Sequence, residues 1–309
     1  MWSQMHGNES TTTKAVWDMV NFLQSADDLA KTVLEHCTLM IVPMLNPDGA
    51  KVYTRENINR VDLNRDAQAL SQPESKALRK LFEDFGPDFC FNLHDQRTLF
   101  SVGNTDKPAT VSFLSPASNE QRDITPSREV AMKIIVAMDA MLQRIIPGQV
   151  GRYDDGFNDN CVGDAFQMMG TPTILFEAGH YPKDYEREKT REYIFLSLLE
   201  ALKVIATGKI EEYEVDGYFQ IPENEKLFMD ILVKNPHAIN PDFGADDVVG
   251  IRFKEVLAGQ EVTFEPEIAE IGPLDGFFGH EIIEGIDLKD IELGPLHKKV
   301  VNLLLQNGN

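Results

Sequence analysis

The chain has 309 residues, of which 42% are hydrophobic and 26% charged, values typical of a globular protein rather than a disordered one. Its 29 Lys and Arg are outnumbered by 50 Asp and Glu, giving a formal net charge of −21. Because such a chain repels nucleic-acid phosphates, we expect no nucleic-acid partner. No apolar run approaches the roughly 20 residues that span a bilayer, so we expect no membrane partner either. The odd number of three cysteines favours a reducing compartment.

Residues 1–208 alternate between helical and strand-like patterns. Apolar residues at helical spacing predict helices over about residues 12–25, 71–85, 127–145 and 185–206, the second opened by a capping box at 71–74. Short apolar runs predict buried strands over 38–42, 89–93 and 173–176, and residues 46–49 (Asn-Pro-Asp-Gly) predict a turn. This alternation predicts an α/β fold with helices on both faces of a mostly parallel sheet.

Residues 209–309 have a different character. By count they hold 21 acidic and 8 basic residues, so −13 of the net charge of −21 falls here. Alternating apolar residues near 249–253 and 262–264 predict half-buried strands, and residues 296–305 predict a terminal helix. We therefore predict two domains, an α/β domain over residues 1–208 and a small, acidic, β-rich domain over residues 209–309.

Three residues have the chemistry of a metal site. His6 and Glu9 form an H-x-x-E pair, whose spacing brings both side chains to the same side of a first helical turn. An imidazole and a carboxylate are good ligands for Zn²⁺, and a catalytic zinc site needs a third protein ligand and an open position. His94 is the candidate, because it ends a strongly apolar strand and parallel sheets bind ligands at the carboxyl ends of their strands.

Other polar residues are candidates for handling a substrate. Asn64 and Arg65 place an amide beside a guanidinium, and such a pair can bind a carboxylate of a substrate. The alternative interpretation is that Arg65 is an exposed arginine that forms a salt bridge. Glu177 ends the strand 173–176, where a carboxylate is either a helix cap or a general base. His180, three residues later, either supports the site or caps a turn.

The order of these motifs along the chain resembles the zinc carboxypeptidase family, the carboxypeptidase A-like metallopeptidases. The motifs lie at residues 6–9, 46–49, 62–65, 92–94 and 176–177, and the resemblance covers about residues 1–206. It implies a three-layer α/β/α sandwich around a mixed sheet, one zinc ion, and removal of C-terminal amino acids from peptides. It further implies roles for individual residues: zinc ligands at His6, Glu9 and His94, carboxylate binding by Asn64 and Arg65, and a general base at Glu177.

The sequence departs from this family in three places. Only five residues precede His6, whereas the family has a substantial N-terminal stretch with edge strands, so we expect a chain that starts internally and lacks those strands. The family stabilises the oxyanion with an upstream arginine, and Arg55 and Arg60 are both candidates. Tyr153 precedes Glu177 by the separation expected of the family's substrate-capping tyrosine. The alternative is that Tyr153 is a loop tyrosine without this role.

The sequence therefore predicts a zinc metallocarboxypeptidase that hydrolyses the C-terminal peptide bond with a zinc-activated water and Glu177 as general base. The alternative is a zinc amidohydrolase that deacylates N-acyl amino acids, since related deacylases share the ligands, the Asn-Arg pair and the glutamate. A third interpretation is a binding module that keeps the fold without catalysis. Both enzymatic interpretations predict a substrate with a free carboxylate and one Zn²⁺ per chain. Residues 209–309 are predicted to serve as a lid, an oligomer contact or a substrate-recruiting domain.

Overall fold

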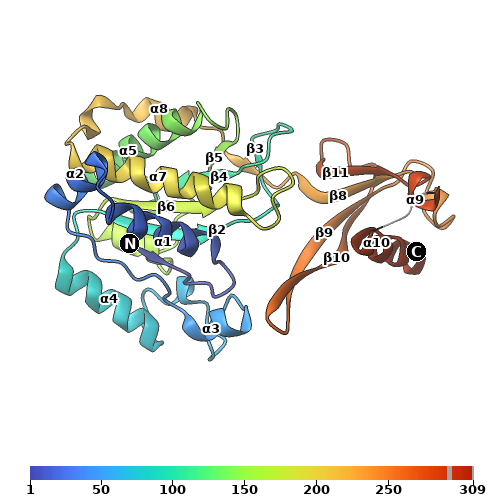
Figure 1. The fold of residues 1–309 in the computed structure, drawn as a ribbon, viewed down its shortest axis with the longest axis horizontal. Coiled ribbons are helices and arrows are strands. Elements are labelled where there is room, and N and C mark those ends of the chain that lie inside the picture. The colour runs from blue at the N-terminus through green and yellow to red at the C-terminus, as the bar shows by residue number, and fades with distance from the viewer. Residues whose placement is uncertain (291–293, 308–309) are drawn as a thin grey trace. The chain divides into compact units, whose positions relative to one another are not determined.

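The computed structural model describes residues 1–290 and 294–307 and divides them into two compact units (Figure 1). The first unit comprises residues 1–97 and 107–224, and the second comprises residues 98–106 and the described residues from 225 onward. The division thus falls later than the boundary predicted after residue 208. The reason is that Tyr218 and Ile221 are buried in the hydrophobic core of the first unit.

The first unit is built on a five-stranded sheet with the strand order β1-β2-β6-β4-β5. Adjacent strands are parallel except β4 and β6, which are antiparallel. The predicted mostly parallel mixed sheet is confirmed. The strands are Trp2–Ser3 (β1), Cys90–Asp95 (β2), Val111–Leu114 (β4), Val150–Arg152 (β5) and Thr173–Ala178 (β6).

Helices cover both faces of this sheet. Successive side chains of a strand point to opposite faces, and because the strands are largely apolar, both faces must be covered. Phe91 and Leu93 of β2 lie in a large core with α1 (Thr11–Leu23), α2 (Asp28–His36), α5 (Pro126–Leu142), α7 (Glu188–Ala206) and α8 (Val215–Gln220). Cys90 lies in a second core with α4 (Pro73–Phe85) and α6 (Val162–Met168). Shorter helices span Pro47–Val52 (α3), Leu63–Arg65 and Ile210–Glu212. The predicted α/β/α sandwich is confirmed (Figure 1).

Three local predictions are wrong. Residues 38–42 form no strand of the sheet: they run extended beside β1, where Val42 alone bridges Trp2. Residues 46–49 open helix α3 rather than a turn, because the Asn46 side chain accepts the Gly49 N–H at 2.8 Å and so caps the helix. The predicted capping box at 71–74 is not formed, since α4 begins at Pro73 behind Gln72, which makes no side-chain cap.

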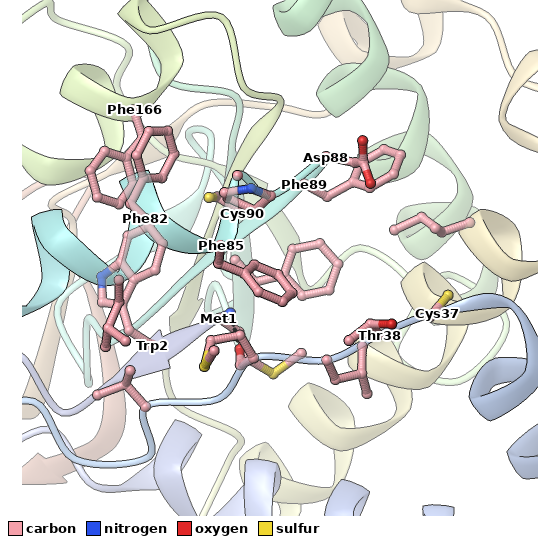
Figure 2. A pocket seen from close by; sticks show the side chains of 18 of the residues that line it. Met1, Trp2, Cys37, Thr38, Phe82, Phe85, Asp88, Phe89, Cys90 and Phe166 are labelled. Atoms are coloured by element: carbon pink, nitrogen blue, oxygen red, sulfur yellow. Dashed lines mark hydrogen bonds between the residues drawn. The ribbon is translucent and has the colours of Figure 1, made fainter.

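A cavity of about 630 Å³ lies at the amino ends of β1 and β2, next to the extended run 38–42. Figure 2 shows aromatic rings of Trp2, Phe82, Phe85 and Phe166 around it, with Met1 at its side. The candidate ligands lie at the other ends of these strands: His6 follows β1, and His94 lies near the carboxyl end of β2. This cavity is therefore separate from the predicted metal site.

The second unit is β-rich, as predicted. Its four-stranded sheet has the order β10-β9-β8-β11, and its core contains Ile231, Val249 and Ile251 with Val300 and Leu304. A two-stranded sheet pairs β3 (Ser101–Val102) with β7 (Asn224–Glu225). The remaining elements are β8 (Phe228–Lys234), β9 (Val248–Ala258), β10 (Glu261–Gly272), β11 (Phe278–Glu284), a short helix Pro236–Ala238, α9 (Asp287–Asp290) and α10 (Pro295–Gln306). Among the described residues, no helix has the length and apolar character needed to cross a membrane.

Candidate metal centre and active site

The parallel pairing of β1 and β2 brings the three predicted ligands together. Trp2 lies opposite Asn92, so the chain that leaves β1 reaches His6 at the same sheet edge where β2 carries His94. Nδ1 of His6 lies 2.7 Å from Oε1 of Glu9 and 3.1 Å from Nδ1 of His94. Nδ1 of His94 lies 2.9 Å from Oε2 of Glu9. One potential ligand atom from each residue thus lies within 4.8 Å of the others.

The donor set fits a zinc ion. Two ligands at 2.0–2.1 Å from a tetrahedral zinc are about 3.3 Å apart, which is close to the distances between these nitrogen and oxygen atoms. Two imidazoles and one carboxylate are a known catalytic zinc set. All three side chains are buried, so no bulk water competes for their lone pairs. His6, Glu9 and His94 therefore offer three ligands that fit a zinc ion.

Electrostatics favour a charged carboxylate at this centre. Burial raises the pKa of Glu9, but the charge of His6 and the contacts with His6 and His94 outweigh it and hold that pKa well below its usual range. Burial lowers the pKa of His6, but Glu9 and Asp62 overcome this and raise it. Burial lowers the pKa of His94, which favours a neutral imidazole, the form that binds metals.

Asp62 orients His6 and was missed by the sequence reasoning. Its Oδ1 lies 3.1 Å from Nε2 of His6, which leaves Nδ1 of that ring for a metal. A carboxylate behind a ligating histidine fixes its tautomer and raises its basicity. The signal was present, since Asp62 stands two residues before Asn64 in the recognised motif.

Close packing of the loop between His6 and Glu9 explains two glycines. A Cβ on Gly7 would lie 2.0 Å from the carbonyl carbon of Gly49, so the loop between His6 and Glu9 rests directly on the backbone of α3. Gly49 is equally confined, because its Cβ would lie 2.6 Å from the carbonyl oxygen of Glu56. The Asn-Pro-Asp-Gly motif is thus the support of the H-x-x-E loop.

The geometry separates the two candidate arginines. Nε of Arg55 donates to Asp62 at 3.0 Å, and its Nη1 lies 3.2 Å from Nδ1 of His6 and 3.5 Å from Oε1 of Glu9. Arg60 is exposed, and its backbone has a left-handed φ of 57°. The structure therefore brings Arg55, and not Arg60, to the predicted metal ligands.

Asn64 and Arg65 lie together beside the start of α6. Oδ1 of Asn64 accepts the backbone N–H of Val162 at 3.0 Å, and this fixes the amide plane. Arg65 is exposed, and its Nη1 donates to its neighbour's carbonyl at 2.6 Å and to Sγ of Cys161 at 3.1 Å. An oriented amide next to an exposed guanidinium is suited to binding a carboxylate.

Glu177 lies directly across the ladder from His94. It is buried, and its Oε2 has no hydrogen-bond partner among the described residues. Burial, followed by the negative charges of Glu9 and Asp95, raises the pKa of its carboxyl well above the usual value. Burial, followed by the negative charges of Glu177 and Glu9, also raises the pKa of Tyr153.

Two further residues were considered near this site. His180 is buried, and its ring lies 4.7 Å from that of Tyr185. Asp95, which the sequence reasoning missed, donates its backbone N–H to Glu9 at 3.2 Å. Its side chain accepts the first N–H groups of α1 at 2.9 and 3.3 Å, and so caps the helix that follows Glu9.

Comparison with known proteins agrees with this geometry. A model of the zinc carboxypeptidase family matches residues 1–66, which contain His6, Glu9, Asn64 and Arg65. The first 66 residues of the chain thus match the zinc carboxypeptidase family. Members of this family are zinc-dependent hydrolases of the metallopeptidase type, as their name says.

Individual relatives carry the same name. Carboxypeptidase SOL1 of Arabidopsis thaliana is 34% identical over 93 residues, 26% of this chain and 19% of that protein. Carboxypeptidase 2 of Trichophyton rubrum is 27% identical over 110 residues, 35% of this chain and 20% of that protein. The matched part is thus about a fifth of the length of these carboxypeptidase relatives.

A solved structure shares the fold. A metallo-carboxypeptidase from Burkholderia cenocepacia superimposes with a TM-score of 0.51 at 20% sequence identity, covering 67% of this chain and 56% of that chain. At this identity the likeness concerns the fold. It agrees with the three-layer sandwich of the first unit.

Proposed function

We propose that the protein is a zinc metallocarboxypeptidase that hydrolyses the C-terminal peptide bond of its substrates. One observation carries the proposal: His6, Glu9 and His94 meet with ligand atoms within 4.8 Å of one another, directly across the ladder from the buried Glu177. We assign one zinc ion per chain to these three ligands. A zinc ion bound there would supply a Lewis acid that acidifies a water molecule and polarises the scissile carbonyl.

The remaining residues handle the substrate and the proton. Asn64 and Arg65 bind the terminal carboxylate, which restricts cleavage to chain ends. Glu177 accepts a proton from the attacking water, for which its raised pKa suits it, and returns that proton to the leaving nitrogen. Arg55 donates hydrogen bonds to the negative charge that develops on the carbonyl oxygen, and Tyr153 covers the bound substrate.

We also propose that the predicted catalytic domain, residues 1–208, carries all of this chemistry. Every residue with an assigned role lies in the first compact unit. In this interpretation the acidic region 209–309 contributes no catalytic group. It controls the access of substrates to the active site or recruits them.

A substrate panel tests the proposed function. The zinc-loaded protein is expected to release the last residue from peptides with a free C-terminus and to leave C-terminally amidated copies of them intact. Preferred hydrolysis of N-acyl amino acids would move the assignment to the deacylase alternative. Absence of hydrolysis in a folded sample with one zinc per chain would contradict both.

A further inference from the structure

The side-chain amide of Asn92 lies in the interior of the first unit with its oxygen unpaired. Asn92 is in the middle of β2 and is only 3% exposed. Its Oδ1 atom is buried and accepts no hydrogen bond from the described residues. A buried carbonyl oxygen without a donor lowers stability about as much as a lost hydrogen bond, and such groups are rare in native proteins. The exception at Asn92 indicates that this amide has a partner in another molecule.

The Asn92 side chain points to the layer of the sandwich that contains α6. Side chains alternate along a strand, so Asn92 shares one face of β2 with Cys90 and His94. Cys90 packs in the smaller core with residues of α4 and α6, whereas His94 is one of the three proposed zinc ligands. The amide is therefore on the same face of the sheet as the proposed zinc site.

A glycine leaves space beside this amide. Gly163 is the second residue of α6, and a Cβ at this position would lie 3.4 Å from Nδ2 of Asn92 and 3.2 Å from Cγ of Pro116. Any side chain longer than a methyl group at position 163 would thus cover the amide. Because glycine stands there, that space is available to a ligand.

The first turn of α6 connects the amide to the proposed carboxylate-binding residues. The residue before Gly163 donates its backbone N–H to Oδ1 of Asn64 at 3.0 Å, and Gly163 itself faces the Asn92 amide. On the other side, His94 follows Asn92 by two residues on the same face of β2. The Asn92 amide therefore lies between the residues proposed to bind the terminal carboxylate and those proposed to bind zinc.

This position indicates which part of a substrate meets the amide. In any peptide, the Cα atom of the last residue lies between the last peptide bond and the terminal carboxylate. A substrate with its carboxylate at Asn64 and Arg65 and its scissile carbonyl at the zinc ligands has this Cα atom between the two sites. The side chain of the last residue is then the part of the substrate that reaches Asn92.

We propose that Asn92 selects the side chain of the C-terminal residue, and that the preferred substrates end in a residue with an uncharged amide or hydroxyl group. This inference rests on the proposed function and specifies its substrate class. An amide offers one acceptor and two donors, so it can pair with an amide or a hydroxyl of the substrate. An apolar side chain leaves Oδ1 unpaired, and a charged one loses more hydration on burial than one neutral amide returns.

The test compares N-acetylated tripeptides that differ only in the last residue, which is Gln or the similarly shaped Met. The wild-type protein with zinc bound is expected to release Gln with a kcat/KM about 10-fold above that for Met, because the Met peptide leaves a buried oxygen unpaired. A second pair, Thr and Val, is expected to differ in the same direction.

Asn92→Leu is expected to bring the ratio of kcat/KM for the Gln and Met peptides below one, mainly through a higher KM for the Gln peptide. Leucine has nearly the volume of asparagine and needs no hydrogen bond, so the variant should fold and keep one zinc per chain. Gly163→Ala supplies a second variant. Its methyl group fills the space beside the amide, and KM should rise more for the Gln peptide than for a peptide that ends in Ala.

Asn240 provides a matched control. It is also a buried asparagine, and its Nδ2 donates to the carbonyl oxygen of Leu304 at 3.1 Å within the second unit. Asn240→Leu therefore removes a buried amide from a unit that has no assigned role in the reaction. This variant should keep the preference for Gln over Met.

The possible results separate this inference from the proposed function. Equal cleavage of the Gln and Met peptides by the wild type refutes the selection by Asn92 and upholds the carboxypeptidase. A preference for Gln that persists in Asn92→Leu refutes the role of Asn92, as does loss of zinc from that variant, which would make Asn92 a structural support of His94. No cleavage of any peptide by a folded sample with zinc bound refutes both proposals.

Discussion

Replacing Arg65 by alanine should weaken binding of substrates with a free terminal carboxylate while leaving the fold intact. The Arg65 side chain is exposed, and it forms none of the ion pairs recorded among the described residues. Loss of such a side chain usually changes the free energy of unfolding by less than about 0.5 kcal/mol. A hydrogen bond between charged groups contributes about 1.5–3 kcal/mol, so KM should rise about 10- to 150-fold with kcat nearly unchanged.

The assay is steady-state hydrolysis of one peptide with a free and with an amidated C-terminus. Arg60→Ala is the matched control, because Arg60 is an exposed arginine in the same loop that contacts none of the predicted ligands. The reasoning is refuted if Arg65→Ala leaves KM unchanged. It is equally refuted if the parent protein hydrolyses the amidated peptide as fast as the free one.

Four further variants test other parts of the site. Arg55→Ala is expected to lower kcat by about 10²–10³ as one lost oxyanion donor, and steady-state kinetics showing no change would remove Arg55 from that role. Asp62→Asn should weaken zinc binding about 10- to 100-fold, measured by competition with a chelator, because His6 loses the carboxylate that orients it. Glu177→Gln should abolish hydrolysis, by about 10²–10⁴, yet retain zinc; loss of the metal would instead make Glu177 a ligand. Burial raises the pKa of Asp164 to about 6, so the folded state binds this proton more tightly than the unfolded state and the wild type loses stability as pH rises from about 4 to about 6. Asp164→Asn should remove that loss, on the order of 3 kcal/mol, in urea unfolding at pH 4 and pH 7, and parallel pH curves would contradict it.

The architecture of the first unit could be predicted because its strands and helices have strong patterns. Phe91 and Leu93 alternate with Cys90 and His94 in β2, and each pair reaches a different layer. The predicted ligands meet because parallel strands end at one sheet edge. Residues 38–42 misled the prediction because an apolar run can equally pack beside a sheet edge, as the single bridge at Val42 shows.

Features that depend on distant contacts escaped the sequence. Asp62 reaches His6 across 56 positions, so only the motif that it shares with Asn64 hinted at this contact. The two compact units divide after residue 224, later than the expected boundary at residue 208, because Tyr218 and Ile221 pack into the first core. Residues 98–106 group with the second unit, where the Phe228 N–H donates to the carbonyl oxygen of Leu99 across more than a hundred residues.

Zinc content per folded chain, measured by elemental analysis on the protein and on His94→Asn, tests the central claim most directly. The account predicts close to one zinc per chain in the parent protein, loss of it in the variant, and a parent melting temperature that falls on chelation. A well-folded parent that takes up no zinc, or a variant that keeps a full equivalent, would contradict it.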